Sequence, residues 1–140
     1  MRRQFEFAIV VMVVAVLALL VMQALERVRT QMEEAGVQTE AAAIRAQLME
    51  VVAHREVFGG QLPASENPFD WVRGRPANYI GAVDRVPTQE SVWYYDSVSK
   101  ELVYRFRNGE LARFRLSRMA GDSGVRGVIG GVGLLRLDNP

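Results

Sequence analysis

The sequence has no cysteine and a single histidine, which excludes or disfavours most kinds of catalytic and metal-binding site. Without cysteine the chain forms no disulfide, no thiolate zinc site and no cysteine nucleophile. With His54 alone, imidazole acid–base catalysis and multi-histidine metal sites are disfavoured. A charge excess is lacking too, because 17 Lys and Arg residues face 16 Asp and Glu residues. The net charge of +1 gives no bulk attraction to polyanions. We therefore expect neither an enzyme nor a nucleic-acid-binding protein.

Three patterns are typical of chemical sites, and each lacks a necessary partner. Glu50 and His54 stand four residues apart on one helix face and could hold a metal ion, but no third ligand is recognisable near them. The serines have no histidine positioned to activate them. Glycines typical of a phosphate loop are not followed by Gly-Lys-Ser/Thr: Gly127, Gly130, Gly131 and Gly133. We expect no catalytic residue, no metal site, no cofactor and no small-molecule substrate.

Residues 7–25 form a long apolar run, FAIVVMVVAVLALLVMQAL, with no charge and one amide, Gln23. A helix of this length rises about 28 Å, close to the hydrocarbon thickness of a bilayer. The sequence therefore predicts a helix that spans the lipid bilayer once. A short N-terminal tail is easiest to leave in the cytoplasm, which places the rest of the chain outside it, in the periplasm if the organism has two membranes.

A removed export signal is the alternative to an uncleaved anchor. Met22-Gln23-Ala24 is a poor match to the small residues that precede a secretory cleavage site. Arg2-Arg3-Gln4-Phe5 resembles a twin-arginine signal, but Glu6 stands where that signal has an apolar residue. We favour the uncleaved anchor.

The helical pattern continues beyond the apolar run. No proline interrupts residues 25–58, and Gly59-Gly60 is typical of a helix end. Gly36 stands where the apolar stripe shifts register, which favours a bend there. The heptad phase breaks after about two repeats, which argues against a coiled coil. Apolar residues recur every three or four positions: Leu25, Val28, Met32, Ala35, Val37, Ala41, Ile44, Leu48 and Val51. The prediction is one helix from about Arg3 to Val57, transmembrane over 1–25 and amphipathic over 26–58.

Residues 59–140 form the third part, a proline-rich loop followed by a sheet. Alternating patterns predict antiparallel strands at 92–96, 101–107 and 110–116, and a glycine-loosened fourth near 132–137. A three-residue loop with a left-handed Gly109 sets Leu102 opposite Phe114 and Tyr104 opposite Ala112. It also sets Glu101 opposite an arginine, Arg115. The aromatic residues of these strands are expected in the core: Trp93, Tyr94, Tyr95, Tyr104, Phe106 and Phe114. The predicted fold class is α+β, a long N-terminal helix packed on a small antiparallel sheet of three to four strands.

The other face of this sheet carries a set of arginines. They are Arg105, Arg107, Arg113 and Arg115, with Arg118 just beyond. Two interpretations stay open. The set is either the solvated side of alternating strands, where charge discourages edge pairing, or a surface that contacts phosphate or polysaccharide anions.

The first residues of the apolar helix carry a family resemblance. Residues 4–11 read QFEFAIVV, in which Glu6 is the lone carboxylate at the start of a long apolar helix. With an amphipathic continuation and a C-terminal sheet, this pattern resembles the type IV pilin and type II secretion pseudopilin superfamily. The stretches ENPFDW (66–71), NYIG (78–81) and WYYD (93–96) also resemble minor pilin-like proteins of the mannose-sensitive haemagglutinin type.

The resemblance implies a function in assembly. In that family the N-terminal helices pack together, and the glutamate that matches Glu6 neutralises the terminal amine of a neighbouring subunit, so Arg2, Phe5 and Glu6 are the implied assembly residues. The family's leader ends in glycine, and none precedes Arg2 here. The implied protein is therefore a minor or accessory inner-membrane subunit, with pilin-like subunits or assembly-platform proteins as partners. A single-pass periplasmic scaffold or adaptor unrelated to pili is the alternative.

Overall fold

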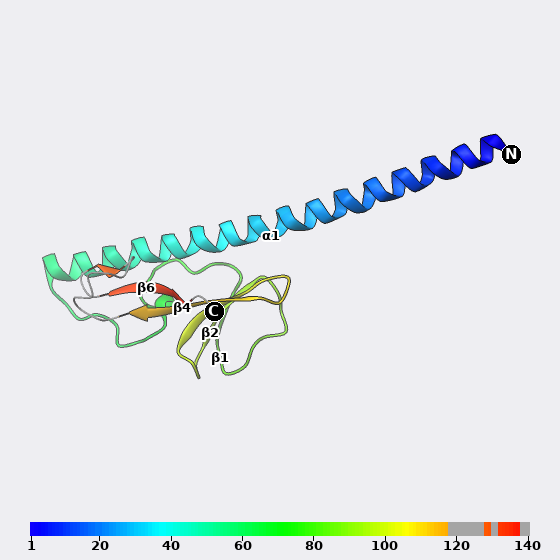
Figure 1. The fold of residues 1–140 in the computed structure, drawn as a ribbon. Helices are drawn as coiled ribbons and strands as arrows, with labels where there is room; N and C mark the ends of the chain where they lie inside the picture. The colour runs from blue at the N-terminus through cyan, green and yellow to red at the C-terminus, as the bar shows by residue number, and fades with distance from the viewer. Residues whose placement is uncertain (118–127, 130–131, 138–140) are drawn as a thin grey trace. The chain divides into compact units, whose positions relative to one another are not determined.

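One long helix and a mixed β-sheet make up the chain, which the computed structural model describes over residues 1–117, 128–129 and 132–137. The α+β class is confirmed, and Figure 1 shows the elements in order. They are α1 (Arg2–Phe58), the short 3₁₀ helix η1 (Pro68–Asp70), β1 (Tyr79–Val83), β2 (Val92–Asp96), β3 (Glu101–Arg105), β4 (Leu111–Ser117), β5 (Val128–Ile129) and β6 (Val132–Leu137).

The helix α1 follows the predicted span closely. It ends where Gly59 adopts a φ of 76°, and the Gly59 N–H donates to the Arg55 carbonyl at 2.7 Å. This left-handed glycine after the last helical residue is the expected helix end. The chain divides into two compact units, Met1–Ala35 and Gly36–Pro140, so the unit boundary falls within α1.

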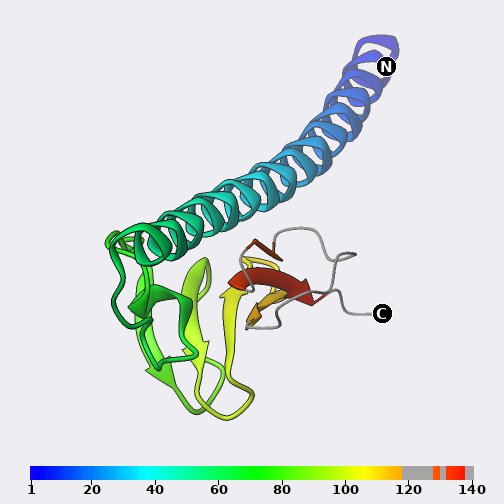
Figure 2. The same ribbon diagram turned by 90° about the vertical axis from the view of Figure 1, so that its left-hand side faces the viewer.

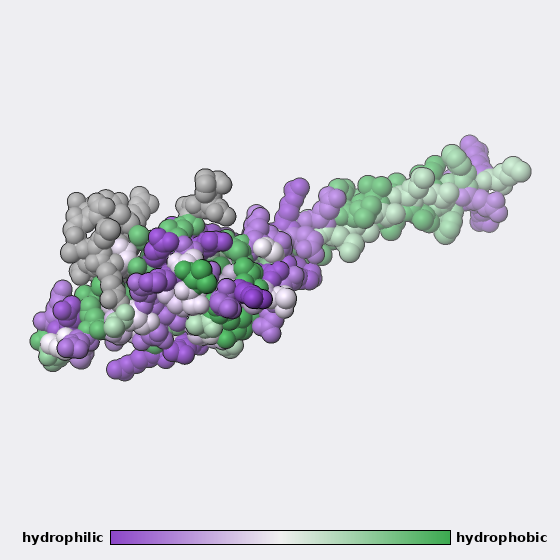
Figure 3. Space-filling view, turned by 90° about the horizontal axis from the view of Figure 1, so that it is seen from below, coloured by the Kyte–Doolittle hydropathy of each residue, from purple (hydrophilic) through white to green (hydrophobic). Residues whose placement is uncertain are grey.

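The first unit contains the apolar run and the charged residues on either side of it. It contains a stretch of α1 that is long and apolar enough to cross a membrane by length and composition, and none of that stretch is buried in the structure. Figure 3 shows hydrophobic side chains, in green, over this part of the helix.

In the second unit, one stripe of α1 packs on the sheet. Its buried members are Val37, Ala41, Ile44, Leu48 and Val52. They share a core with Trp93, Leu102, Phe114 and Leu134 of the sheet and with Phe69 of η1. Figures 1 and 2 show this half of the helix lying along the sheet. The expected stripe is confirmed from Val37 to Leu48, with Val52 in the buried place expected of Val51, which is partly buried. Its earlier members are exposed and belong to the first unit: Leu25, Val28, Met32 and Ala35.

The sheet is larger than predicted and not wholly antiparallel. The strand order is β1-β2-β3-β4-β6-β5, with five strands of five or more residues and the two-residue β5. The prediction of three to four antiparallel strands is wrong because β1 pairs with β2 in parallel. Gly81, with a φ of 104°, lies in a register irregularity of β1, and no helix links β1 to β2. The chain therefore lacks the crossover helix that normally indicates parallel pairing.

The register of the β3–β4 hairpin is confirmed. Leu102 lies opposite Phe114 and Tyr104 opposite Ala112. The loop closes as expected for three residues, because the Gly109 N–H donates to the Phe106 carbonyl at 3.0 Å, and Gly109 has a φ of 86°. The strand expected near 132–137 is also present, as β6, antiparallel to β4. All six aromatic residues expected in the core are buried.

Candidate functional site

The residues implied in assembly lie in the first two turns of α1, immediately before the apolar stretch. Arg2, Phe5 and Glu6 are all exposed. Glu6 has no hydrogen bond or ion pair with another residue in the part of the chain that the structure describes. A carboxylate at the edge of a lipid-facing helix is costly unless a cation lies near it. The side chain is therefore open to a partner from outside the chain.

The two arginines of β4 contact one buried carboxylate of β3. Glu101 accepts from Arg115 at 2.8 Å and from Arg113 at 3.4 Å. The Glu101 side chain is only 7% exposed, whereas those of Arg113 and Arg115 are 40% and 54% exposed. Two guanidiniums thus cover a carboxylate that would be expensive to bury alone.

The other two arginines of the set have different positions. Arg105 donates to the Pro87 carbonyl and is partly buried, and Arg107 is exposed in the β3–β4 turn. The structure therefore places Arg105, Arg113 and Arg115 on the same side of the sheet, as their alternation predicts. Arg118 lies outside the described residues.

Two further ionisable side chains share this face. Burial raises the pKa of Tyr94, and the nearby Asp96 carboxylate raises it further. For Asp96, burial acts to raise the pKa, but hydrogen bonds from Ser99 and from the Val98 N–H outweigh it and hold the pKa below its usual value. The negative charges of Asp96 and Glu101 thus offset much of the positive charge on this face. Anion binding there stays a prediction.

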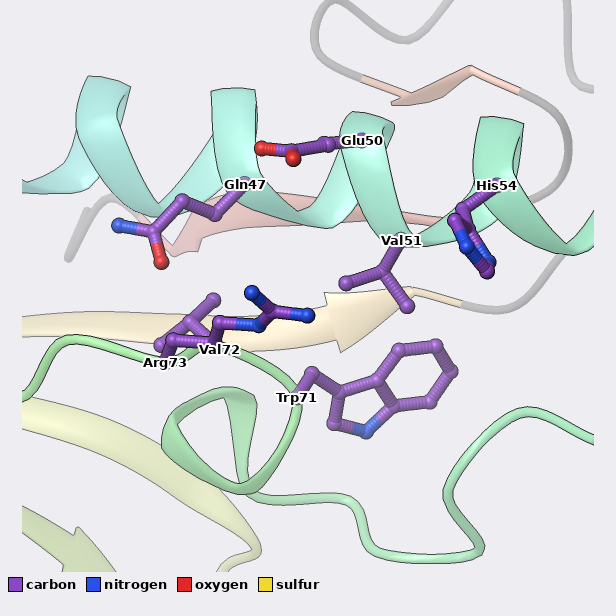
Figure 4. A pocket seen from close by; sticks show the side chains of 7 residues that line it. All are labelled: Gln47, Glu50, Val51, His54, Trp71, Val72 and Arg73. Carbon is purple, nitrogen blue, oxygen red and sulfur yellow. The ribbon is translucent and has the colours of Figure 1, made fainter.

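A cavity of about 200 Å³ lies beside the C-terminal part of α1, and sequence reasoning missed it. Figure 4 shows its walls, which are formed by Gln47, Glu50, Val51 and His54 of α1 and by Trp71, Val72 and Arg73 of the following loop. Glu50 and His54 do lie on the same wall, as their spacing predicts. Among the described residues no group of three or more His, Asp or Glu side chains is placed to hold a metal ion. Of the four C-terminal glycines, only Gly133 is described, as part of β6.

The loop wall of the cavity is held by hydrogen bonds that the sequence alone does not reveal. The Trp71 indole donates to the Ser65 carbonyl at 2.8 Å, and the Trp71 N–H donates to the Pro68 carbonyl at 3.1 Å. The side chain of Asn67 caps η1 by accepting from the Phe69 N–H at 3.1 Å. An Asn-Pro pair followed by two aromatics is a signal of such a local turn.

No protein-family model, curated protein or solved structure matches the chain. Function is therefore inferred from the residues and geometry described above.

Proposed function

We propose that this chain is a pilin-like, single-pass inner-membrane protein that takes part in type IV pilus or type II secretion assembly as a minor or accessory subunit. Its N-terminus is cytoplasmic and its C-terminal domain is periplasmic. Its partners are the lipid bilayer and other pilin-like subunits or assembly-platform proteins, which it meets through the apolar part of α1.

The observation that carries this proposal is the uncovered apolar stretch of α1. Its large hydrophobic side chains between residues 7 and 25 are 46% to 71% exposed. A continuous apolar surface of this size is not stable in water. Its length suits the bilayer, and its small number of polar atoms leaves van der Waals packing against lipid or another helix as the way to cover it.

Glu6 supports the choice of a helix partner over lipid alone. Its carboxylate stands one residue before the apolar stretch and has no ion-pair partner among the described residues. A cationic group from a neighbouring helix, such as a terminal amine, would offset the cost of holding this charge at the edge of the hydrocarbon.

The fold of the second unit is also compatible with the proposal. One face of the C-terminal half of α1 is buried on a sheet, and the strands of this sheet follow the helix in the chain. A helix that is apolar all round and then becomes one-sided is suited to a bilayer followed by a folded head.

The test is photo-crosslinking of the full-length protein in its native membrane from a probe at Val14. We expect pilin-family subunits or platform proteins to be captured. Glu6→Gln should lower the yield several-fold, because it removes the charge that a cationic partner would neutralise. Glu26→Gln is the matched control, since Glu26 is exposed beyond the apolar stretch and pairs with Arg29 at 3.5 Å, and its yield should not change.

Capture of no pilin-family partner, with the chain still retained in the membrane, would favour the scaffold or adaptor instead. An equal yield for Glu6→Gln and wild type would remove Glu6 from the assembly contact.

A further inference from the structure

The C-terminal end of α1 combines an open cavity with two unusually exposed apolar side chains. The helix-end cavity is the one lined by Gln47, Glu50, Val51, His54, Trp71, Val72 and Arg73. The helix-end knob is formed by Val57 and Phe58, which are 74% and 76% exposed. Both features lie within the second unit, and neither takes part in the proposed membrane contact.

The cavity has an apolar floor and an unpaired polar rim. Trp71 and Val72 are buried and Val51 is partly buried, so they provide the floor. In Figure 4, Glu50 comes from the helix side and Arg73 from the loop side, with the cavity between them. Neither makes an ion pair or hydrogen bond with another described residue. An apolar hollow with a few convergent polar groups is typical of a binding site.

The knob continues the helix face that forms one wall of the cavity. Gln47, Val51, His54 and Phe58 follow at intervals of four, three and four residues, which places them on one face of α1. The ring of Phe58 lies 4.8 Å from the His54 ring, at the rim of the cavity. Knob and cavity are therefore immediate neighbours on one surface.

We propose that this surface binds the same surface of a second copy of the chain, so that the helix-end knob of each copy fills the helix-end cavity of the other. A projection and a hollow side by side are what a two-fold contact requires, because each patch must complement itself. A buried aromatic anchor in an apolar pocket is also the usual centre of a protein contact.

The charges around the two features fit this arrangement. The cavity rim has one negative and one positive side chain, Glu50 and Arg73. The residues just before the knob also have one of each sign, Arg55 and Glu56, and both are exposed. A two-fold axis lets Arg55 of each copy approach Glu50 of the other, while Glu56 approaches Arg73. Such rim pairs add orientation and specificity more than affinity.

This inference is independent of the proposed function. A two-fold contact closes on itself and yields a dimer, whereas contacts through the apolar part of α1 involve other subunits. The two proposals can therefore be tested separately. Loss of the contact between the helix-end knob and cavity leaves crosslinking from Val14 unchanged, and loss of crosslinking from Val14 leaves the knob–cavity dimer unchanged.

The absence of cysteine makes disulfide crosslinking a direct test. Full-length Glu56→Cys and Gly74→Cys chains are mixed in lipid vesicles and oxidised, because Glu56 is exposed beside the knob and its replacement leaves Val57 and Phe58 in place. Gly74 is next to Arg73, and a Cβ there meets no atom within 4 Å, so the cysteine is tolerated. We expect a disulfide-linked dimer joining one chain of each kind. The pair Val98→Cys and Gly74→Cys should give none, since Val98 is also exposed, at 75%, but lies in the β2–β3 turn.

Adding Val57→Asp to both chains should lower the dimer yield at least tenfold, because burial of one such side chain is worth about that factor in an association constant. Adding Val98→Asp is the matched control and should have no effect. Near-ultraviolet circular dichroism checks that both variants stay folded, as expected for changes at exposed positions. Equal crosslinking of the Glu56 and Val98 pairs, or a yield insensitive to Val57→Asp, would overturn the proposal.

Discussion

At the scale of single residues, the least expected feature is the buried glutamate at the start of β3, Glu101. Glutamate is ordinarily exposed, so a sequence pattern assigns Glu101 to the solvent side. The hairpin register did predict that Glu101 lies opposite Arg115. Its burial was not predictable, because it depends on two arginine side chains from β4 closing over it. The carboxylate thus links two strands through charge-assisted hydrogen bonds.

Glu101→Gln should destabilise the protein by about 1–2 kcal/mol, since the amide cannot replace two charge-assisted bonds in a buried position. Glu66→Gln is the control, because the ion pair of Glu66 with Lys100 has exposed side chains, and the cost there should be below about 0.5 kcal/mol. Denaturant unfolding of the full-length protein in detergent micelles, followed by tryptophan fluorescence, measures both. Equal decreases in the free energy of unfolding would mean that the burial of Glu101 does not strengthen its contribution to stability.

At the scale of elements, the β3–β4 hairpin was predictable and the sheet edge was not. The hairpin register follows from alternation in the two strands and from Asn108-Gly109, because only a three-residue loop keeps the apolar residues on one face. The strand β1 contains Gly81 and pairs in parallel with β2, a contact set by the path of the intervening loop. The pairing of Glu40 with the Trp93 indole joins residues far apart in the chain and has no local signal.

Gly109→Ala should destabilise the hairpin by about 1–2 kcal/mol, because its φ of 86° is a conformation that a side chain with a Cβ rarely adopts. Gly74→Ala is the control, since that glycine has no positive φ and open space around its Cβ position, and we expect a change within about 0.5 kcal/mol. The free energy of unfolding from urea titration checks both values. If both substitutions lower the free energy of unfolding by the same amount, the positive φ of Gly109 is not the reason for the loss of stability.

The helix-end cavity is also a feature of elements. Its helix wall was visible in the spacing of Glu50 and His54. Its floor was not, since Trp71 is positioned by hydrogen bonds within the preceding loop. Sequence periodicity describes the faces of helices and strands, and it contains little information on how a loop with several prolines folds back onto them.

At the scale of the whole molecule, the helix α1 belongs to two compact units that treat its apolar side chains differently. Residues up to Ala35 expose their apolar side chains, whereas the stripe from Val37 onward buries them within the second unit. The division predicted from composition fell after Leu25, where polar residues begin, ten residues before the boundary in the structure. Composition does not show where the sheet begins to cover the helix, because that depends on strands far along the chain.

Two arginines introduced into the apolar stretch, Val13→Arg with Leu17→Arg, should lower the fraction of protein retained in the membrane after a carbonate wash. Each arginine costs about 2.5–3.5 kcal/mol at the centre of a spanning helix. The control pair Val28→Arg and Met32→Arg lies beyond the apolar stretch on an exposed part of α1, so retention should match wild type. Loss of retention in both pairs, or in neither, would contradict a bilayer span confined to residues 7–25.

The order of the elements along the chain has a consequence for biosynthesis. The apolar stripe of α1 ends at Val52, but its partners Leu102 and Phe114 are translated later. At 5–20 residues per second, the ribosome needs roughly 3 to 12 s to add the intervening stretch of about 60 residues. For that time the nascent chain exposes the apolar helix face of residues 37–52 without the strands that cover it. With the topology proposed above, we expect periplasmic chaperones to bind residues 37–52 until the hairpin emerges.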